Sequence, residues 1–282
     1  MWLWMSVASA VLLGLYDVTK KQSLKRNGVL YVLLGATALS ALFLLPFISA
    51  GCLEWHLRLV LKAALVTTSW VSGLVGLKYL PLTTASTIKA SRPVIVVLFS
   101  IILFAERLTL WQWVGVVTVF AALWMLSRSS KREGIGIRGN RGIAAMVISV
   151  LSGAASALYD KHIMADMEPL FVQSWANIYI TLLLAVCVLV KALHDGAERE
   201  KFRFDWRIVL IAVLITVSDA LYFFSLKQDG ALLSVISLIR RSSVLITFVA
   251  GAIFFKEKHI RSKAAALAVL LAGITLLMFA SK

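Results

Sequence analysis

The stretch GALLSVISLIRRSSVLITFVAGAIFF, residues 230–255, is apolar and long enough to cross a lipid bilayer, yet two arginines lie near its centre. A second apolar run, TTASTIKASRPVIVVLFSIILF at residues 83–104, contains a lysine and an arginine in the same way. A cation at the centre of a membrane helix costs about 2.5–3.5 kcal/mol on insertion scales. A polar pathway through a membrane protein, with a preference for anionic groups, accounts for these four cations: Lys89, Arg92, Arg240 and Arg241.

The composition excludes most soluble protein classes. The chain has 282 residues, of which 60% are apolar and 15% charged, whereas about a quarter of a soluble domain is charged. Its net charge of +15 is carried mainly by short loops between apolar runs, which indicates membrane topology and not nucleic-acid binding. Cys52 and Cys187 are too few for a metal site or a disulfide framework. With no catalytic or nucleotide-binding motif in a suitable context, we expect neither an enzyme nor a cofactor.

Hydropathy predicts an all-α polytopic membrane protein with ten transmembrane helices, since a bilayer core needs about 20 apolar residues per helix. The long basic loop at 128–141 divides the chain into two five-helix repeats, 1–127 and 142–282. The expected runs are 2–19, 28–49, 58–78, 82–104, 110–127, 142–160, 169–191, 208–227, 230–255 and 262–281.

The two halves are similar in sequence. GLYD at 14–17 recurs as ALYD at 157–160, and FAERLTLWQWVGVVTVFAALWML at 104–126 is similar to residues 255–278. Glu106 and Glu257 are 151 residues apart, as are Lys89 and Arg240. Because each repeat has an odd number of helices, we expect the second repeat to insert upside down, as in many secondary transporters.

The basic residues also predict the orientation. Nineteen Lys and Arg residues fall on the side of the membrane that holds the loop after the first helix, here called side B. The opposite side, side A, has six, with Lys62 counted among them. The positive-inside rule therefore predicts that side B is cytoplasmic and that both termini lie outside the cell.

This pattern resembles the drug/metabolite transporter superfamily, specifically its EamA-type members. The resemblance rests on two five-helix repeats, each with a GERLT-like turn before its last helix, AERLT at 105–109 and KEKHI at 256–260. It covers nearly the whole chain and implies transport, while members of the superfamily carry many different substrates. Many members keep both termini in the cytoplasm, which differs from the orientation predicted here.

The four intramembrane cations are the main candidates for substrate binding. Lys89 and Arg92 are three residues apart and are expected to share a helix face, whereas the adjacent Arg240 and Arg241 must diverge by about 100°. In the sugar-phosphate branch of the superfamily, basic residues on the ninth helix hold the substrate phosphate, which favours a similar role for the arginine pair. The alternative is that these cations pair with acidic residues and lock helices together.

Three acidic residues have candidate roles. Asp219 lies in the middle of the eighth predicted helix and is a candidate proton carrier or counter-ion. Asp17 and Asp160 end the first and sixth predicted helices, each after a tyrosine, and are candidates for gating or for helix anchoring. These tyrosines are Tyr16 and Tyr159.

The sequence thus favours a secondary transporter in a bacterial plasma membrane that moves a small anionic metabolite by alternating access. Its expected partners are a phosphate- or carboxylate-bearing substrate, the lipid bilayer, and either protons or a counter-substrate. Two alternatives remain open: a proton-coupled exporter of cations, drugs or amino acids, and a non-transporting lipid scrambler or scaffold. The sequence makes no prediction of the oligomeric state.

Overall fold

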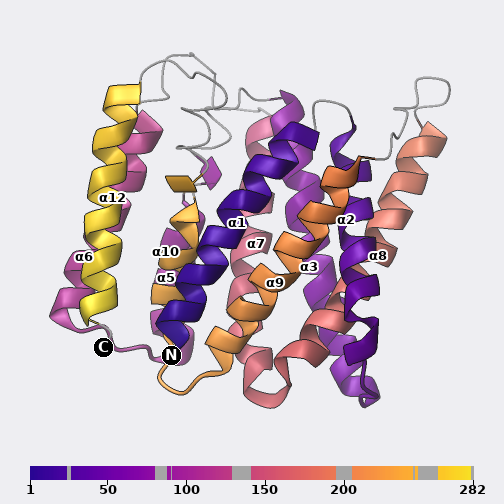
Figure 1. The fold of residues 1–282 in the computed structure, drawn as a ribbon, viewed down its shortest axis with the longest axis horizontal. Coiled ribbons are helices and arrows are strands. Elements are labelled where there is room, and N and C mark those ends of the chain that lie inside the picture. The colour runs from indigo at the N-terminus through magenta and orange to yellow at the C-terminus, as the bar shows by residue number, and fades with distance from the viewer. Residues whose placement is uncertain are drawn as a thin grey trace.

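In the computed structural model the chain is a bundle of helices, and no strand occurs in the described residues (Figure 1). The structure describes residues 1–23, 27–79, 88–89, 91–128, 141–194, 205–243, 245–246 and 260–280. The helices are α1 (Trp2–Ser23), α2 (Val29–Leu44), α3 (Leu53–Tyr79), α5 (Arg92–Phe104), α6 (Leu110–Arg128), α7 (Arg141–Asp166), α8 (Pro169–His194), α9 (Trp206–Lys227), α10 (Leu233–Arg241) and α12 (Ile260–Ala280), with a 3₁₀ turn at Leu45–Phe47.

Six of these helices are long and apolar enough to cross a membrane, namely α1, α2, α3, α7, α8 and α9. Three shorter apolar helical segments accompany them, at Arg92–Phe104, Leu110–Ala122 and Ala268–Ala280. Large apolar side chains such as Ile102 and Leu193 are each 72% exposed on the outside of the bundle. An apolar outer surface of this kind suits a lipid environment, in which every backbone polar group of a helix is satisfied internally.

The helix boundaries correct two expectations. The helix α3 begins at Leu53 and not at 58, so Lys62 is nine residues inside a membrane helix and is not a loop residue. Asp17 and Asp160 do not end their helices, because α1 and α7 each continue for six residues beyond them. At 1.5 Å per residue, both carboxylates lie about 9 Å inside the ends of the helices.

Parts of two predicted helices and the predicted loop between the repeats lie outside the described residues. Of the run at 82–104 the structure describes 88–89 and 91–104, and of the run at 230–255 it describes 230–243 and 245–246. Glu257 is also outside the described part of the chain.

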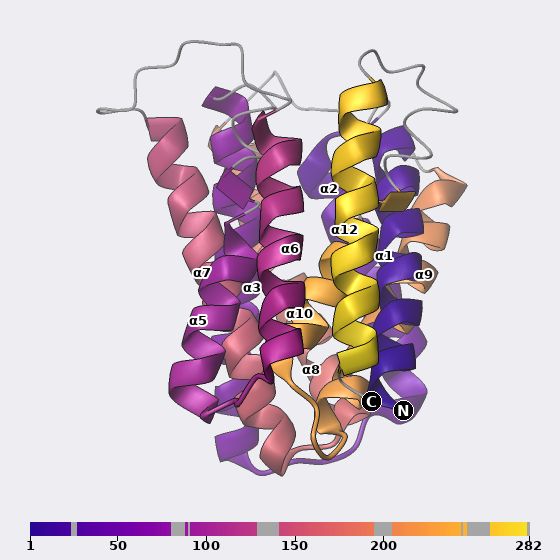
Figure 2. The same cartoon turned by 90° about the vertical axis from the view of Figure 1, so that its left-hand side faces the viewer.

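Helices of the two sequence halves pack against each other throughout the bundle. The most extensive pairs are α3 with α7, α1 with α9, and α6 with α12. The α6–α12 pair stands at one end of the molecule, as the two views show (Figures 1 and 2). The helices of the two halves can be matched in chain order, so that α1, α2, α3 and α6 correspond to α7, α8, α9 and α12. When each helix is replaced by its counterpart, the α1–α9 pair becomes the α7–α3 pair, and the α2–α8 and α6–α12 pairs remain the same.

The same exchange relates two serine contacts, which we call the serine clasps. Ser9 on α1 donates to the carbonyl of Ser218 on α9 at 2.7 Å, and the Ser218 hydroxyl donates back to the Ser9 carbonyl at 2.9 Å. Ser69 on α3 and Ser149 on α7 form the same reciprocal pair, at 2.7 and 2.6 Å. Small residues that hydrogen-bond across a helix interface let the two backbones approach closely.

A carboxylate from the first half caps a helix of the second half. Buried Glu106 follows α5, and it accepts hydrogen bonds from the backbone N–H groups of Leu233 and Ser234 at 2.6 and 3.1 Å. The Ser234 hydroxyl donates to the same carboxylate at 2.5 Å. These N–H groups open α10 and have no partner inside the helix, and the negative charge also suits the positive end of the helix dipole.

We predict that Glu106→Ala destabilises the protein by about 1–3 kcal/mol, because it leaves buried donors at the start of α10 unsatisfied. Thermal unfolding of the purified protein in detergent measures this effect. The control is Glu168→Ala, since the Glu168 side chain is 78% exposed and its ion pair with Lys227 is long, at 3.8 Å. Equal melting temperatures for the two variants would contradict the capping role.

Candidate transport site

Both helices that contain the intramembrane cations are irregular next to those cations. Ser91 lies in a turn, its N–H bonds to the Ile88 carbonyl, and α5 begins at the following residue, Arg92. In the second half α10 ends at Arg241, and Ser242 bonds back three residues to Ile239. Irregular backbone at membrane depth is tolerated where it is buried in protein or lines a cavity.

This geometry changes one expectation about Lys89 and Arg92. The two residues lie on either side of the turn at Ser91 and do not share the face of one continuous helix. Arg92 is the first residue of α5, where the helix dipole adds to its positive potential. Arg240 and Arg241 occupy the last turn of α10, where the dipole stabilises cations instead.

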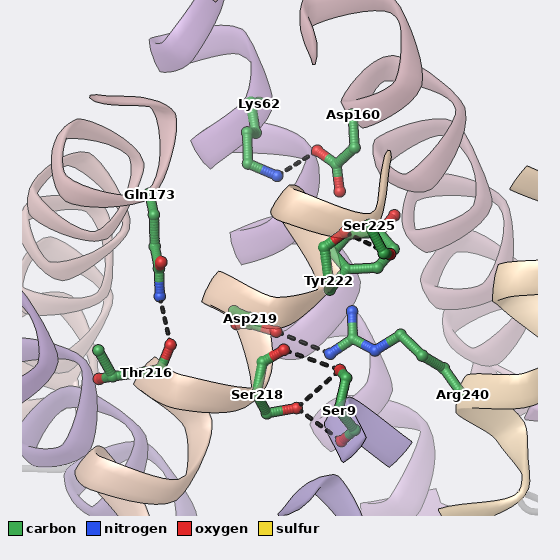
Figure 3. A network of polar contacts seen from close by, with 10 residues as sticks. All are labelled: Ser9, Lys62, Asp160, Gln173, Thr216, Ser218, Asp219, Tyr222, Ser225 and Arg240. Atoms are coloured by element: carbon green, nitrogen blue, oxygen red, sulfur yellow. Dashed lines mark hydrogen bonds and ion pairs between the residues drawn. The ribbon is translucent and has the colours of Figure 1, made fainter. Parts of the chain in front are cut away.

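Arg240 is neutralised by an acidic residue. Its Nη2 donates to Asp219 Oδ1 on α9 at 2.7 Å, and its guanidinium lies over the Tyr222 ring, 4.2 Å from the centroid (Figure 3). The side chains are 18% and 32% exposed, so a solute can approach the pair. The structure therefore supports the expected role of Asp219 as a counter-ion.

Arg241 is near a different carboxylate from the one that pairs with its neighbour. The carboxylate within its electrostatic range is Asp17 on α1, and no ion pair joins them among the described residues. Asp17 is also within range of Lys20, Lys89 and Arg240. One carboxylate thus lies within range of four cations, of which Arg240 already has Asp219 as its partner.

Arg92 is held against α7 by a glycine. Its Nη2 donates to the Gly153 carbonyl at 2.6 Å, and a Cβ on Gly153 would lie 2.9 Å from the guanidinium carbon. The Arg92 side chain remains exposed, although Arg240, Arg241 and Tyr222 lie within its electrostatic range. Arg92 is therefore a cation that lies near charged groups of other helices and is still exposed.

Lys89 lies near α3, since a Cβ on Gly73 would be 3.6 Å from its Nζ. Its electrostatic neighbours are Lys20, Arg241, Asp17 and Arg92. Neither Lys89 nor Arg92 forms an ion pair with a described residue. Both are therefore candidates to bind an anion.

Sequence reasoning missed the most buried ion pair. Lys62 on α3 is paired with Asp160 on α7, and both side chains are less than a tenth exposed (Figure 3). The Lys62 ammonium also lies over the Phe223 ring, 4.9 Å from the centroid. The apolar residues on both sides of Lys62 were the available signal, and the prediction failed because it placed the helix start five residues too late.

The two candidate tyrosines lie in different surroundings. Tyr16 is buried on α1 and accepts a hydrogen bond from Lys20 Nζ at 3.2 Å. Tyr159 is half-buried on α7, near His162 and within range of the Arg58 charge. Only Tyr16 thus belongs to the charged interior.

Cations exceed acids in this interior, and each group lies within electrostatic range of another. Its described residues include six cationic side chains and three carboxylates, a formal excess of three positive charges among them. The cations are Lys20, Lys62, Lys89, Arg92, Arg240 and Arg241, and the carboxylates are Asp17, Asp160 and Asp219.

The EamA-like transporter family matches the sequence over residues 1–128 and 140–279, which is nearly the whole chain. The chain belongs to the EamA-like transporter family. This family is part of the drug/metabolite transporter superfamily, and its members are transporters and not enzymes. The EamA protein described here is accordingly an integral membrane protein for the transport of small molecules.

The fold has a counterpart among solved structures. One crystal structure aligns with this EamA protein with a TM-score of 0.75 and 17% sequence identity, and the alignment covers 98% of both chains. At this identity the likeness shows the fold alone. No curated protein shows significant sequence similarity to the chain.

We predict that Gly153→Ala destabilises this EamA protein by about 1–3 kcal/mol through overpacking. The added Cβ would lie 2.9 Å from the Arg92 guanidinium and 2.7 Å from Ser69 Oγ. Gly35→Ala is the control, because its nearest neighbour, Ile208 Cγ2, is 3.2 Å away. Denaturant unfolding in detergent compares the two variants, and an equal or smaller loss in Gly153→Ala would contradict the close contact.

Proposed function

We propose that this EamA protein is a secondary transporter that moves a small organic anion, bearing a phosphate or a carboxylate, by alternating access. The observation that carries the proposal is the set of cations without an ion pair in the described interior, Lys20, Lys89, Arg92 and Arg241. An exposed arginine at the start of a helix can donate two hydrogen bonds to a phosphate or carboxylate, and the positive end of the helix dipole also stabilises that anion. The excess of cations disfavours the alternative of a cation exporter, which needs uncompensated acids.

The proposed architecture is two inverted five-helix repeats, residues 1–127 and 142–282, joined by the loop at 128–141. Three observations support it. The family matches in two ranges that correspond to the halves, the helix pairs exchange with the halves, and the two serine clasps are related in the same way. Transporters with inverted repeats bind substrate where the repeats meet, near the bilayer midplane.

The proposed location is a bacterial plasma membrane with side B in the cytoplasm. The burial of Lys62 supports this orientation, because it removes one of the six basic residues assigned to side A. The remaining bias of basic loops toward side B is therefore stronger than the sequence alone indicated.

Coupling is proposed to run through Asp219. An anion that binds Arg240 competes with the Asp219 carboxylate, and a carboxylate released from its arginine binds a proton more readily. Uptake of the anion then brings a proton with it. Exchange of one anion for another is the alternative mode of coupling.

Purified protein in proteoliposomes tests the substrate class directly. The probes are radiolabelled glucose 6-phosphate, 3-phosphoglycerate, malate and choline. We expect transport of at least one anion, and we expect Arg92→Met and Arg241→Met to lower its kcat/KM about 100-fold, since a hydrogen bond to a charged group contributes about 1.5–3 kcal/mol. Arg58→Met is the control, because Arg58 lies at the exposed end of α3 and should retain transport within about twofold.

Transport of choline in preference to every anion would contradict the proposal. Full anion transport by both Arg92→Met and Arg241→Met would contradict the assignment of the site.

Asp219→Asn separates the two modes of coupling. Asparagine cannot take up a proton, so we expect this variant to lose accumulation driven by an imposed pH gradient while it retains exchange of labelled for unlabelled anion. The measurement is uptake into proteoliposomes with and without the gradient. Gradient-driven accumulation equal to that of the unmodified protein would show that Asp219 is not the proton carrier.

A further inference from the structure

The described side chains of the charged interior differ in exposure. Lys62, Asp160, Tyr222 and Phe223 are each no more than about 5% exposed. Asp17, Lys20 and Lys89 are half-buried, and Arg92 is exposed. The buried group belongs to the side A end, where α3 begins and α7 ends, at the lower edge of Figure 1.

Two ion pairs join α3 to α7 at this end of their interface, which we call the α3–α7 seam. The outer pair joins Arg58 Nη1 to Asp166 Oδ2 at 2.9 Å, and its side chains are 30% and 53% exposed. The inner pair is buried Lys62 with Asp160. Towards side B the same two helices are held by glycine packing instead, because a Cβ on Gly76 would lie 2.4 Å from the Met146 side chain.

The seam between α1 and α9, which corresponds to it in the other half, has no such ion pair between its described side chains. Both seams have a serine clasp, so the two differ in charge and not in their central packing. Among the described side chains an ion pair therefore joins α3 to α7 but not α1 to α9, and it lies at the end where Lys62 and Asp160 are buried.

From this asymmetry we infer that Lys62 and Asp160 form the side A gate of the transporter. The gate opens when this ion pair separates, while the Ser69–Ser149 clasp and the glycine packing hold α3 to α7 nearer side B. The structure is then the state in which side A is closed. The inference rests on the proposed alternating access, and it assigns to Lys62 a role in closing the pathway and not in binding substrate.

Two adjacent residues of α9 connect the gate with the central site. The Phe223 ring lies under the Lys62 ammonium, and the Tyr222 ring packs on the Arg240 guanidinium, as Figure 3 shows for Tyr222. An anion that displaces Asp219 from Arg240 therefore acts on the segment of α9 that supports the gate. This contact gives a physical route from substrate binding to gate opening.

Cysteine accessibility tests the gate without any knowledge of the substrate. The reporter is Ser156→Cys in a background with Cys52→Ser and Cys187→Ser; Ser156 is buried on α7, one turn deeper than Asp160. In proteoliposomes a membrane-impermeant maleimide is applied from side A. We expect Lys62→Met to raise the labelling rate about tenfold or more, since loss of one partner of a buried ion pair strongly destabilises the closed state.

The controls use the same seam and the same assay. Arg58→Met removes the exposed outer pair between the same helices and should leave the labelling rate within about twofold. The charge exchange Lys62→Asp with Asp160→Lys should restore slow labelling. The native Cys52, exposed beside the start of α3, reports access of the reagent to side A in the Cys187→Ser protein.

Asp160→Asn, which keeps the shape of the side chain, replaces Lys62→Met if that variant does not fold. Labelling of the reporter at the unmodified rate in the folded variant would overturn the gate, as would equally fast labelling of the charge-exchanged protein. The outcome is independent of the substrate: fast labelling together with no anion transport would retain the gate and reject the anion.

Discussion

The arrangement of the charged interior depends on the free-energy cost of placing charged side chains inside the hydrocarbon core of a bilayer. Six cations cannot be held in a membrane bundle unless carboxylates, backbone carbonyls or water compensate them. The structure shows the first two means: Lys62 and Arg240 have carboxylates, and Arg92 has the carbonyl of Gly153. The cations that lack an ion pair define where a ligand of opposite charge is most stabilised.

Much of this was accessible from the sequence, because membrane helices are set by length and hydropathy. The all-helical fold, the helix positions and the family followed from apolar runs, from the AERLT turn and from cations within the runs. The divergence of Arg240 and Arg241 was predicted from helix geometry alone, and the structure pairs Arg240 with Asp219 on α9. Sequence periodicity therefore predicts well those features that depend on the geometry of a single helix.

The errors arose where contacts between helices decide the outcome. The turn at Ser91 separates Lys89 from Arg92, and no periodicity in the sequence reveals it beyond the following proline. Lys62, although inside the predicted run 58–78, was counted with the basic residues of side A because charge near a helix end is ordinarily solvated, and the partner on α7 explains its burial. In the same way, the pairing of Ser9 with Ser218 and of Ser69 with Ser149 depends on which helices become neighbours.

The cap that Glu106 places on α10 has a mechanical consequence. A turn from the first half of the chain is bonded to the start of a helix from the second half, so neither can shift without the other. In the proposed alternating-access cycle, the bodies that move are therefore not the two halves of the sequence. Each body would be a composite that contains segments of both halves, interlocked through this contact.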